Sequence, residues 1–171
     1  MKKTMLLLAA MMVGLMGLTA CGDDDNDEPA QDKTLTTTYE VKVSQDLLDV
    51  ANVVMRYKGN NGENKFEAIT SPQEWKKTVT TKKYPAPVGV LFEVSEKDTY
   101  SSTKDAYDLY IEVEIDCENY RGSHESKQTF GSKTTPVNNA DVPKACKNNF
   151  NNKVFGFVYA EDGSASGSIS F

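Results

Sequence analysis

The stretch that decides the fold runs from Tyr107 to Asp116 and reads YDLYIEVEID. Apolar residues occupy every second position, and four acids and a tyrosine fill the positions between them. A helix would spread these apolar residues around its circumference, whereas a β-strand places all of them on one face. We therefore predict a strand with one face in the core and the other in water.

The C-terminal end repeats this pattern, because small or apolar residues alternate with serines from Ala165 to Phe171. Residues 153–160, just before it, are rich in Val, Phe and Tyr, and Asp162-Gly163 lies between the two runs. Asp-Gly favours the positive φ angles of a two-residue type I′ turn. The pattern predicts a β-hairpin closed by such a turn.

Other β-prone runs are bounded by polar or proline-containing segments, which indicates further strands. They cover residues 35–43, 50–58, 65–70, 75–80 and 88–96, with Asn60-Asn61-Gly62 as the turn of a second hairpin. The single tryptophan, Trp75, is expected to be a large anchor of the core. The alternative is an exposed ring on which a sugar could stack.

Only one segment favours a helix. Asp141 is a good N-cap residue and Pro143 suits a first helical turn, so we predict a short helix near 141–149. Residues 118–139 read as a loop with one edge strand near 127–130. Seven to nine short strands with almost no helix predict an all-β fold over residues 34–171, an antiparallel β-sandwich of immunoglobulin-like type. A small closed barrel is the alternative.

The N-terminal residues have the layout of a secretory signal. Lys2 and Lys3 precede an apolar run from Met5 to Leu18, and small residues follow it. A membrane-spanning helix needs about 20 apolar residues, and this run is shorter. We predict a signal peptide over residues 1–20, with a permanent transmembrane segment as the weaker alternative.

The end of this signal, Leu18-Thr19-Ala20-Cys21, resembles the lipobox of bacterial lipoproteins. The resemblance implies that Cys21 is diacylated, becomes the mature N-terminus and anchors the chain in a membrane. The alternative is an ordinary signal peptide whose Cys21 later enters a disulfide. Residues 21–33 are strongly acidic and favour a flexible tether.

An aspartate cluster, Asp23-Asp24-Asp25, follows Cys21 almost directly. This arrangement resembles the surface-export signal of lipoproteins from the Bacteroidota. It implies a lipid anchor in the outer membrane and display on the cell surface. The resemblance covers only the first thirty or so residues, and it indicates a location rather than an activity.

Two of the three cysteines remain if Cys21 carries lipid. Cys117 and Cys146 would then be an even pair in a compartment that permits disulfides, so we predict a bond between them. Such a bond would stabilise the domain by roughly 3 to 4 kcal/mol on the chain-entropy model. Two separate reduced thiols are the alternative.

The charge of the folded part is close to balanced. Of the 19 basic and 25 acidic side chains in the chain, Lys2 and Lys3 lie in the signal and six acids lie between Asp23 and Asp32. From Lys33 onward 17 basic and 19 acidic side chains therefore remain, and the basic residues are scattered. This distribution argues against nucleic acid as a partner.

No catalytic motif stands out, and we expect neither a metal site nor a cofactor. The single histidine, His124, is predicted to lie in a solvated loop. Asp108, Glu112 and Glu114 would line the wet face of the strand with spacings that a glycosidase pair could use, although any solvated strand gives such spacings. Asp105, Asp108, Asp116 and the acids of the tether are candidate calcium ligands, without an EF-hand pattern.

These observations favour a non-catalytic module that is attached to the membrane through its lipid and binds a glycan or an outer-membrane protein. The first alternative is an extracellular hydrolase that works through carboxylates. The second is a structural, pilin-like or coat subunit, in which donated strands extend a sheet.

Overall fold

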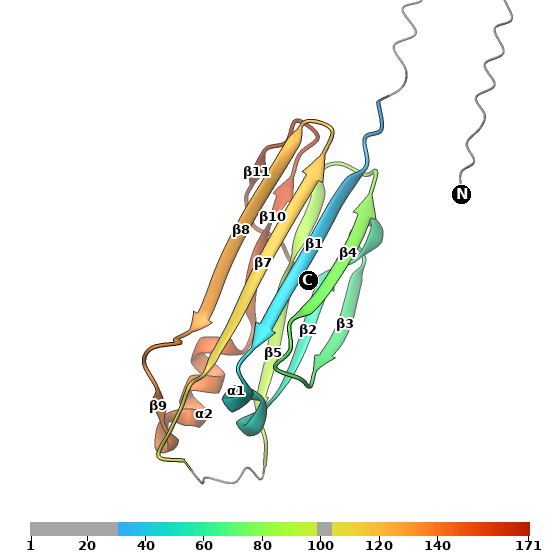
Figure 1. Ribbon diagram of the computed structural model, residues 1–171. Coiled ribbons are helices and arrows are strands. Elements are labelled where there is room, and N and C mark those ends of the chain that lie inside the picture. The colour runs from blue at the N-terminus through green and yellow to red at the C-terminus, as the bar shows by residue number, and fades with distance from the viewer. Residues whose placement is uncertain (1–30, 99–103) are drawn as a thin grey trace, which may run out of the picture. The chain divides into compact units, whose positions relative to one another are not determined.

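The computed structural model describes residues 31–98 and 104–171. The predicted signal peptide, the lipidation site Cys21 and most of the tether lie outside these described residues. The described part folds as two antiparallel sheets that pack face to face around one hydrophobic core (Figure 1). Within residues 31–98 and 104–171, no helix has the length and apolar content needed to cross a membrane.

The first sheet has the strand order β4-β1-β7-β8. Its strands are β1 (Leu35–Val43), β4 (Trp75–Thr81), β7 (Tyr110–Asn119) and β8 (Gly122–Gly131). The second sheet has the order β11-β10-β5-β2-β3. Its strands are β2 (Ala51–Lys58), β3 (Asn64–Ile69), β5 (Ala86–Glu96), β10 (Lys153–Tyr159) and β11 (Ala165–Ser166). Two short strands, β6 (Ala106–Tyr107) and β9 (Val137–Asn138), pair separately.

The predicted all-β antiparallel sandwich is confirmed. The order of the strands within its sheets differs from that of an immunoglobulin constant domain. In an immunoglobulin constant domain the first strand lies at the edge of the ABED sheet, whereas β1 lies between β4 and β7 here. The resemblance to that fold is therefore one of architecture, two antiparallel sheets enclosing a core.

The alternation in the deciding stretch is confirmed as a burial pattern. Leu109, Ile111, Val113 and Ile115 are each at most 2% exposed, and the intervening residues of β7 are half-buried. The strand itself begins at Tyr110, because the chain first makes the short strand β6 and pairs with β9. It continues three residues beyond the predicted end, to Asn119.

One tyrosine connects the two sheets through the core. The hydroxyl of Tyr39, on β1, donates to the carbonyl oxygen of Lys58 on β2 at 2.8 Å. It also accepts from the backbone N–H of Gly89 on β5 at 3.3 Å. Burial raises the pKa of this hydroxyl, because the phenolate would lose its hydration. Tyr39 therefore stays neutral and fixes the two sheets relative to each other.

Both predicted hairpins are present, but the Asp162-Gly163 turn is not of type I′. That turn requires positive φ at both central residues, and among the described non-glycine residues only Asn61 and Asn152 have positive φ. Instead the N–H of Gly163 bonds to the carbonyl of Ala160, and Gly163 has φ +90°. This is the three-residue loop with glycine in the left-handed position.

The predicted edge strand near 127–130 is present as part of β8, but the loop predicted over the rest of residues 118–139 is wrong, because β8 spans ten of these residues. A two-residue turn joins β7 to β8, and the side chain of Asn119 accepts from the N–H groups of Arg121 and Gly122 there. Inward positions of β8 include His124 and Ser126, which are polar and half-buried. The apolar alternation that marks β7 is therefore missing from β8, and only its pairing partner reveals it.

The helical prediction near 141–149 is confirmed by a 3₁₀ turn (Asn139–Asp141), the helix α2 (Val142–Ala145) and a π-helical turn (Cys146–Phe150). A second short helix, α1 (Gln45–Val50), was not predicted. Its N-cap is Ser44, whose hydroxyl accepts from the N–H of Leu47 at 3.2 Å. A serine followed by an acidic first turn was the available signal.

The predicted disulfide is absent: Cys117 and Cys146 are both free, buried thiols. A disulfide needs Cα atoms within about 7 Å, but Cys117 lies near the β7–β8 turn and Cys146 follows α2 at the other end of the sandwich (Figure 1). The Sγ of Cys117 instead contacts the hydroxyl of Thr37 at 3.6 Å. Burial raises the pKa of each thiol to about 11, so both stay protonated and unreactive near neutral pH.

The C-terminal run forms a strand only at Ala165 and Ser166. Beyond Gly167, which has φ +72°, it crosses the outer face of the second sheet. Gly89 and Gly156 are paired on β5 and β10, and a Cβ built on either would lie within 2.6 Å of the Cδ1 of Ile169. The two glycines thus form a floor on which Ile169 packs.

Aromatic residues pack at two further places, over the outer face of the second sheet and at the edge of the core. The ring of Phe171 lies 4.6 Å from the Nζ of Lys58, whose residue is only 8% exposed. Trp75 is half-buried and packs edge-on against Tyr57, with 5.1 Å between ring centroids. Trp75 therefore contributes to the core from the edge strand β4, as its expected role as an anchor requires.

Candidate functional site

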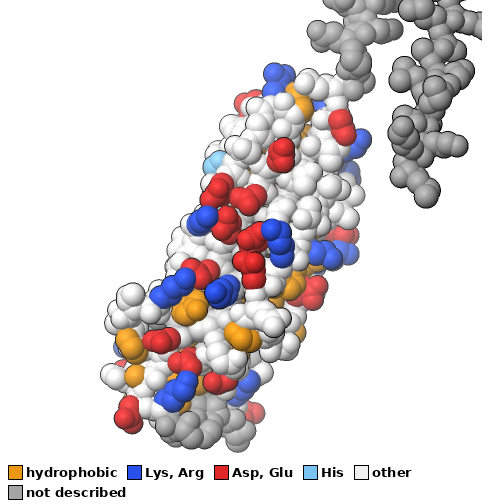
Figure 2. Space-filling view, in the orientation of Figure 1, with side chains coloured by type: hydrophobic (Ala, Val, Ile, Leu, Met, Phe, Trp, Pro, Cys, Tyr) orange, Lys and Arg blue, Asp and Glu red, His pale blue; other side chains and the backbone are white. Residues whose placement is uncertain are grey.

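The outer face of the first sheet is covered by polar side chains, and its middle is acidic. We call this surface the acidic face and define it by the carboxylates of Glu40 on β1, Glu112, Glu114 and Asp116 on β7, and Glu125 on β8. Figure 2 shows acidic side chains gathered over the middle of the sheet, with basic side chains beside them. The strand alternation that buries the apolar residues of β7 necessarily turns these acids outward.

Strand register brings the acids of three strands together. Glu114 lies directly opposite Glu40 on one side and Lys127 on the other, and Asp116 lies opposite Glu125. Directly opposed residues on one face of a sheet are the closest cross-strand neighbours, and like charges there are destabilising. Two such like-charge pairs, Glu40 with Glu114 and Asp116 with Glu125, therefore lie side by side.

Lysines at both sides of the acidic face compensate part of this repulsion. Lys76 pairs with Glu40, and Lys133 pairs with Glu112. The Nζ of Lys127 lies 3.1 Å from an oxygen of Glu114 and 2.8 Å from an oxygen of Glu125. All three lysine side chains are about half exposed, so each pair is worth little in stability and can exchange partners.

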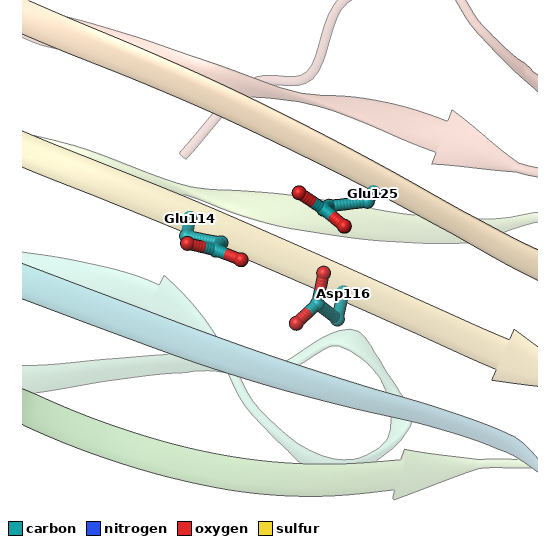
Figure 3. Close-up of side chains that lie close together, drawn as sticks. All are labelled: Glu114, Asp116 and Glu125. Carbon is teal, nitrogen blue, oxygen red and sulfur yellow. The ribbon is translucent and has the colours of Figure 1, made fainter.

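Glu114, Asp116 and Glu125 form the densest part of the acidic face (Figure 3). One carboxylate oxygen of each lies within 4.8 Å of those of the other two. The pKa of Asp116 is raised above its ordinary value, first by partial burial and then by the negative charges of Glu114 and Glu125. Asp116 has no ion pair with any described residue.

Chemically, this arrangement suits a cation. Carboxylate oxygens are the ligands that calcium prefers, and they also accept charge-assisted hydrogen bonds from lysine or arginine. Lys127 already supplies one ammonium group to two of the three acids. Beside this cluster lies a hollow of about 310 Å³, lined by four glutamates and by Lys42 and Lys127. A long cationic side chain of a partner would fit this hollow.

The predicted carboxylate candidates do not all gather here. Glu112 and Glu114 are neighbours on the acidic face, and each is paired with a lysine. Asp108 precedes β7, and its backbone N–H donates to Asp46 at 2.8 Å. Asp105 lies just before β6, and its backbone carbonyl accepts a hydrogen bond from the N–H of Asn139. Of the predicted calcium ligands among the described residues, only Asp116 belongs to the cluster.

His124 lies on a strand and not in the predicted solvated loop. Its ring is half-buried on β8 and packs edge-on against Phe157, with 4.9 Å between ring centroids. Its Nε2 lies 3.0 Å from the hydroxyl of Ser126. These contacts give the histidine a packing role between the two sheets.

Sequence reasoning missed Glu40 and Glu125 as members of the site. Each lies in a run where the neighbouring residues give no chemical signal, and each reaches Glu114 or Asp116 only through pairing with β7. The acids of β7 could be placed on one face from their spacing. The acids of β1 and β8 could not, because register is set by tertiary pairing.

Comparisons with models of protein families, with curated proteins and with solved structures find no match to this chain.

Proposed function

We propose that this protein is a surface lipoprotein, anchored in the outer membrane by lipid on Cys21, that binds a protein partner without catalysis. The acidic face is the contact surface, and its partner carries exposed lysine or arginine side chains. One observation carries the proposal: an uncovered sheet face on which like-charged carboxylates of neighbouring strands are held side by side.

Electrostatics support a cationic partner. Cross-strand repulsion between carboxylates raises the free energy of the unbound protein, and a partner ammonium or guanidinium group would relieve it. Partial burial raises the pKa of Asp116 first, and the neighbouring negative charges raise it further. A concentrated charge of one sign also steers an oppositely charged partner and speeds association at low salt.

The other part of the proposal is that lipid on Cys21 and the acidic tether hold the protein at the outer membrane. This part is supported by the lipobox-like Leu18-Thr19-Ala20-Cys21 and by the aspartate cluster that follows it. Mass spectrometry of the mature protein tests it directly, and we expect an acylated N-terminal Cys21. A Cys21→Ala variant should lose its membrane attachment, and protease added to intact cells should digest the native protein but spare a periplasmic control. An unmodified sulfur at Cys21 would contradict the anchor.

Binding by the acidic face is tested with charge-reversal variants of the full chain in native outer membranes. We expect Glu114→Lys together with Asp116→Lys to abolish cross-linking to the partner that the native chain captures, and high salt to weaken that capture. The matched control is Glu63→Lys with Glu96→Lys, which makes the same change in net charge at exposed positions away from the acidic face. Equal loss in both double variants would contradict a role of this face.

Two alternatives have their own outcomes in these experiments. Hydrolysis of an extracellular polymer that disappears in both Glu112→Gln and Glu114→Gln would support a carboxylate-dependent hydrolase. Concentration-dependent fibres of the pure chain would support a structural, pilin-like or coat subunit. A glycan that competes with the protein partner for the acidic face would shift the partner class from protein to glycan.

A further inference from the structure

A second concave region lies where β8 ends, and it shares only Thr129 with the hollow beside the acidic face. It is a cavity of about 490 Å³ between the segment after β8, the π-helical turn and the first residue of β10. This volume is in the range of small-molecule sites, which span roughly 300–1,000 Å³. The lining of the cavity combines polar residues with the apolar Leu109, Phe130 and Val137.

The wall after β8 is held in place at both of its ends. Gly131 has φ +76°, and a Cβ there would lie 2.3 Å from the carbonyl oxygen of Leu109 and 2.6 Å from the ring of Phe150. The N–H of Ser132 then bonds to that same carbonyl, and its hydroxyl accepts from the N–H of Thr135 at 2.9 Å. At the far end, β9 pairs with β6. The wall is therefore formed in advance of any ligand.

The π-helical turn supplies the opposite wall. Cys146 and Phe150 bury one side of this turn, and the N–H of Asn151 closes it on the carbonyl of Cys146 at 3.0 Å. Asn148 and Asn149 line the cavity from its exposed side, and neither side-chain amide has a hydrogen-bond partner among the described residues. π-Helical turns are rare and are frequent at functional sites.

Lys153 is the only charged side chain among the described residues that line this cavity. It forms no ion pair with any residue of the described part, in contrast to Lys127 and Lys133 on the acidic face. Because no carboxylate pairs with it, the ammonium of Lys153 can pair with an anion that enters the cavity.

We propose that this cavity binds a single sugar unit that bears a carboxylate, such as a uronic acid. Lys153 pairs with the carboxylate, and the amides of Asn148 and Asn149 bond to ring hydroxyls, since each amide both donates and accepts. Phe130 packs against the apolar C–H groups of the ring. The residues that would bind this ligand are not among those that define the acidic face, and the site would serve a glycan rather than a cationic protein.

Calorimetric titration of the full chain in detergent tests the site. The probes are glucuronate and its methyl glycoside, with glucose and acetate as partial ligands. We expect both glucuronate probes to bind more tightly than either partial ligand, because the site uses the carboxylate and the hydroxyls together. Equal binding of free glucuronate and its glycoside would indicate recognition of a sugar at the end of a longer chain as well as of the free sugar.

Variants separate the contributions. Lys153→Gln should weaken glucuronate binding by about tenfold or more and leave glucose binding unchanged. Asn149→Ala should weaken binding of both sugars. The control is Lys147→Gln, on the same π-helical turn but outside the cavity lining, and it should bind as the native chain does. No heat with either glucuronate probe, or equal losses in the Lys153 and Lys147 variants, would overturn the proposal.

Discussion

The outer faces of the two sheets differ in what covers them. On the second sheet the C-terminal segment lies over the Gly89–Gly156 pair, and Ile169 and Phe171 bury backbone and the ammonium of Lys58. On the first sheet the acidic face is open to water, and its charges are balanced only in part by half-exposed lysines. Both faces belong to antiparallel sheets, but one is covered by the chain's own C-terminal segment and the other is exposed to water.

This difference indicates that the covered face contributes to stability and that the acidic face is available for binding. A face built from glycines and covered by the chain's own terminus contributes to stability, because its close contacts exclude water and leave no room for added atoms. A face that holds like charges side by side costs stability and retains potential for binding a cation. Changes on the covered face should therefore affect folding, and changes on the acidic face should affect charge-dependent behaviour.

The largest effect is expected from Gly156→Ala. The new Cβ would lie 2.3 Å from the carbonyl oxygen of Val88, which is backbone, and 2.6 Å from Ile169. Such overpacking should lower the free energy of unfolding by about 3 kcal/mol, measured by urea denaturation. Thr129→Ala, an exposed position on β8, is the control and should change it little. Equal stability of the two variants would contradict a stabilising role of the covered face.

A smaller loss is expected from Ile169→Ala, because this residue is half-buried and its removal uncovers the glycine floor without forcing a clash. We expect a loss of about 1 kcal/mol in the same denaturation experiment. The double variant with Gly156→Ala should lose less than the sum of the two, because the contact with Ile169 is then gone. Full additivity would mean that the C-terminal segment does not rest on these glycines.

On the acidic face, Asp116→Asn should stabilise the protein at neutral pH by up to about 1 kcal/mol, because it removes a partly buried charge and its repulsion from Glu114 and Glu125. Because the folded-state pKa of Asp116 is raised, native stability falls as pH rises from its ordinary value of 3.8 through that raised pKa. The advantage of the variant should therefore vanish at lower pH. Thermal melts at several pH values measure it.

The matched control for Asp116 is Asp162→Asn, in the hairpin of the second sheet. Bonds from Ser164 lower the pKa of Asp162, so its stabilising contribution is present above the ordinary carboxyl pKa and is lost as pH falls through the lowered one. This variant should be destabilised at neutral pH and approach the native chain in acid. The same sign of pH dependence for both variants would contradict the assigned environments.

The smallest effect is expected from a reductant. Since Cys117 and Cys146 are free thiols, dithiothreitol should leave the melting temperature of the folded domain unchanged, and thiol reagents should label both residues only on unfolding. A clear decrease in melting temperature would mean that a covalent bond contributes to the stability that we assign here to packing.

The sequence alone was sufficient for the strongly patterned elements. The alternation around Ile111 and Val113 predicted the central strand, and residues 35–43 coincide with β1. Local chemistry also located both hairpins, because turn residues act over short distances. It was not sufficient for β8, whose inward positions carry polar residues such as His124, or for α1, a helix of only six residues.

The candidate site was predictable only in part. Alternation alone turned Glu112, Glu114 and Asp116 to one face, because it follows from the period of a strand. Only tertiary structure placed Glu40 and Glu125 beside them, separated Cys117 from Cys146 and laid Ile169 across the glycine floor. Those contacts depend on strand register and chain path, which arise from packing between segments distant in sequence and leave no mark in the residues next to each one.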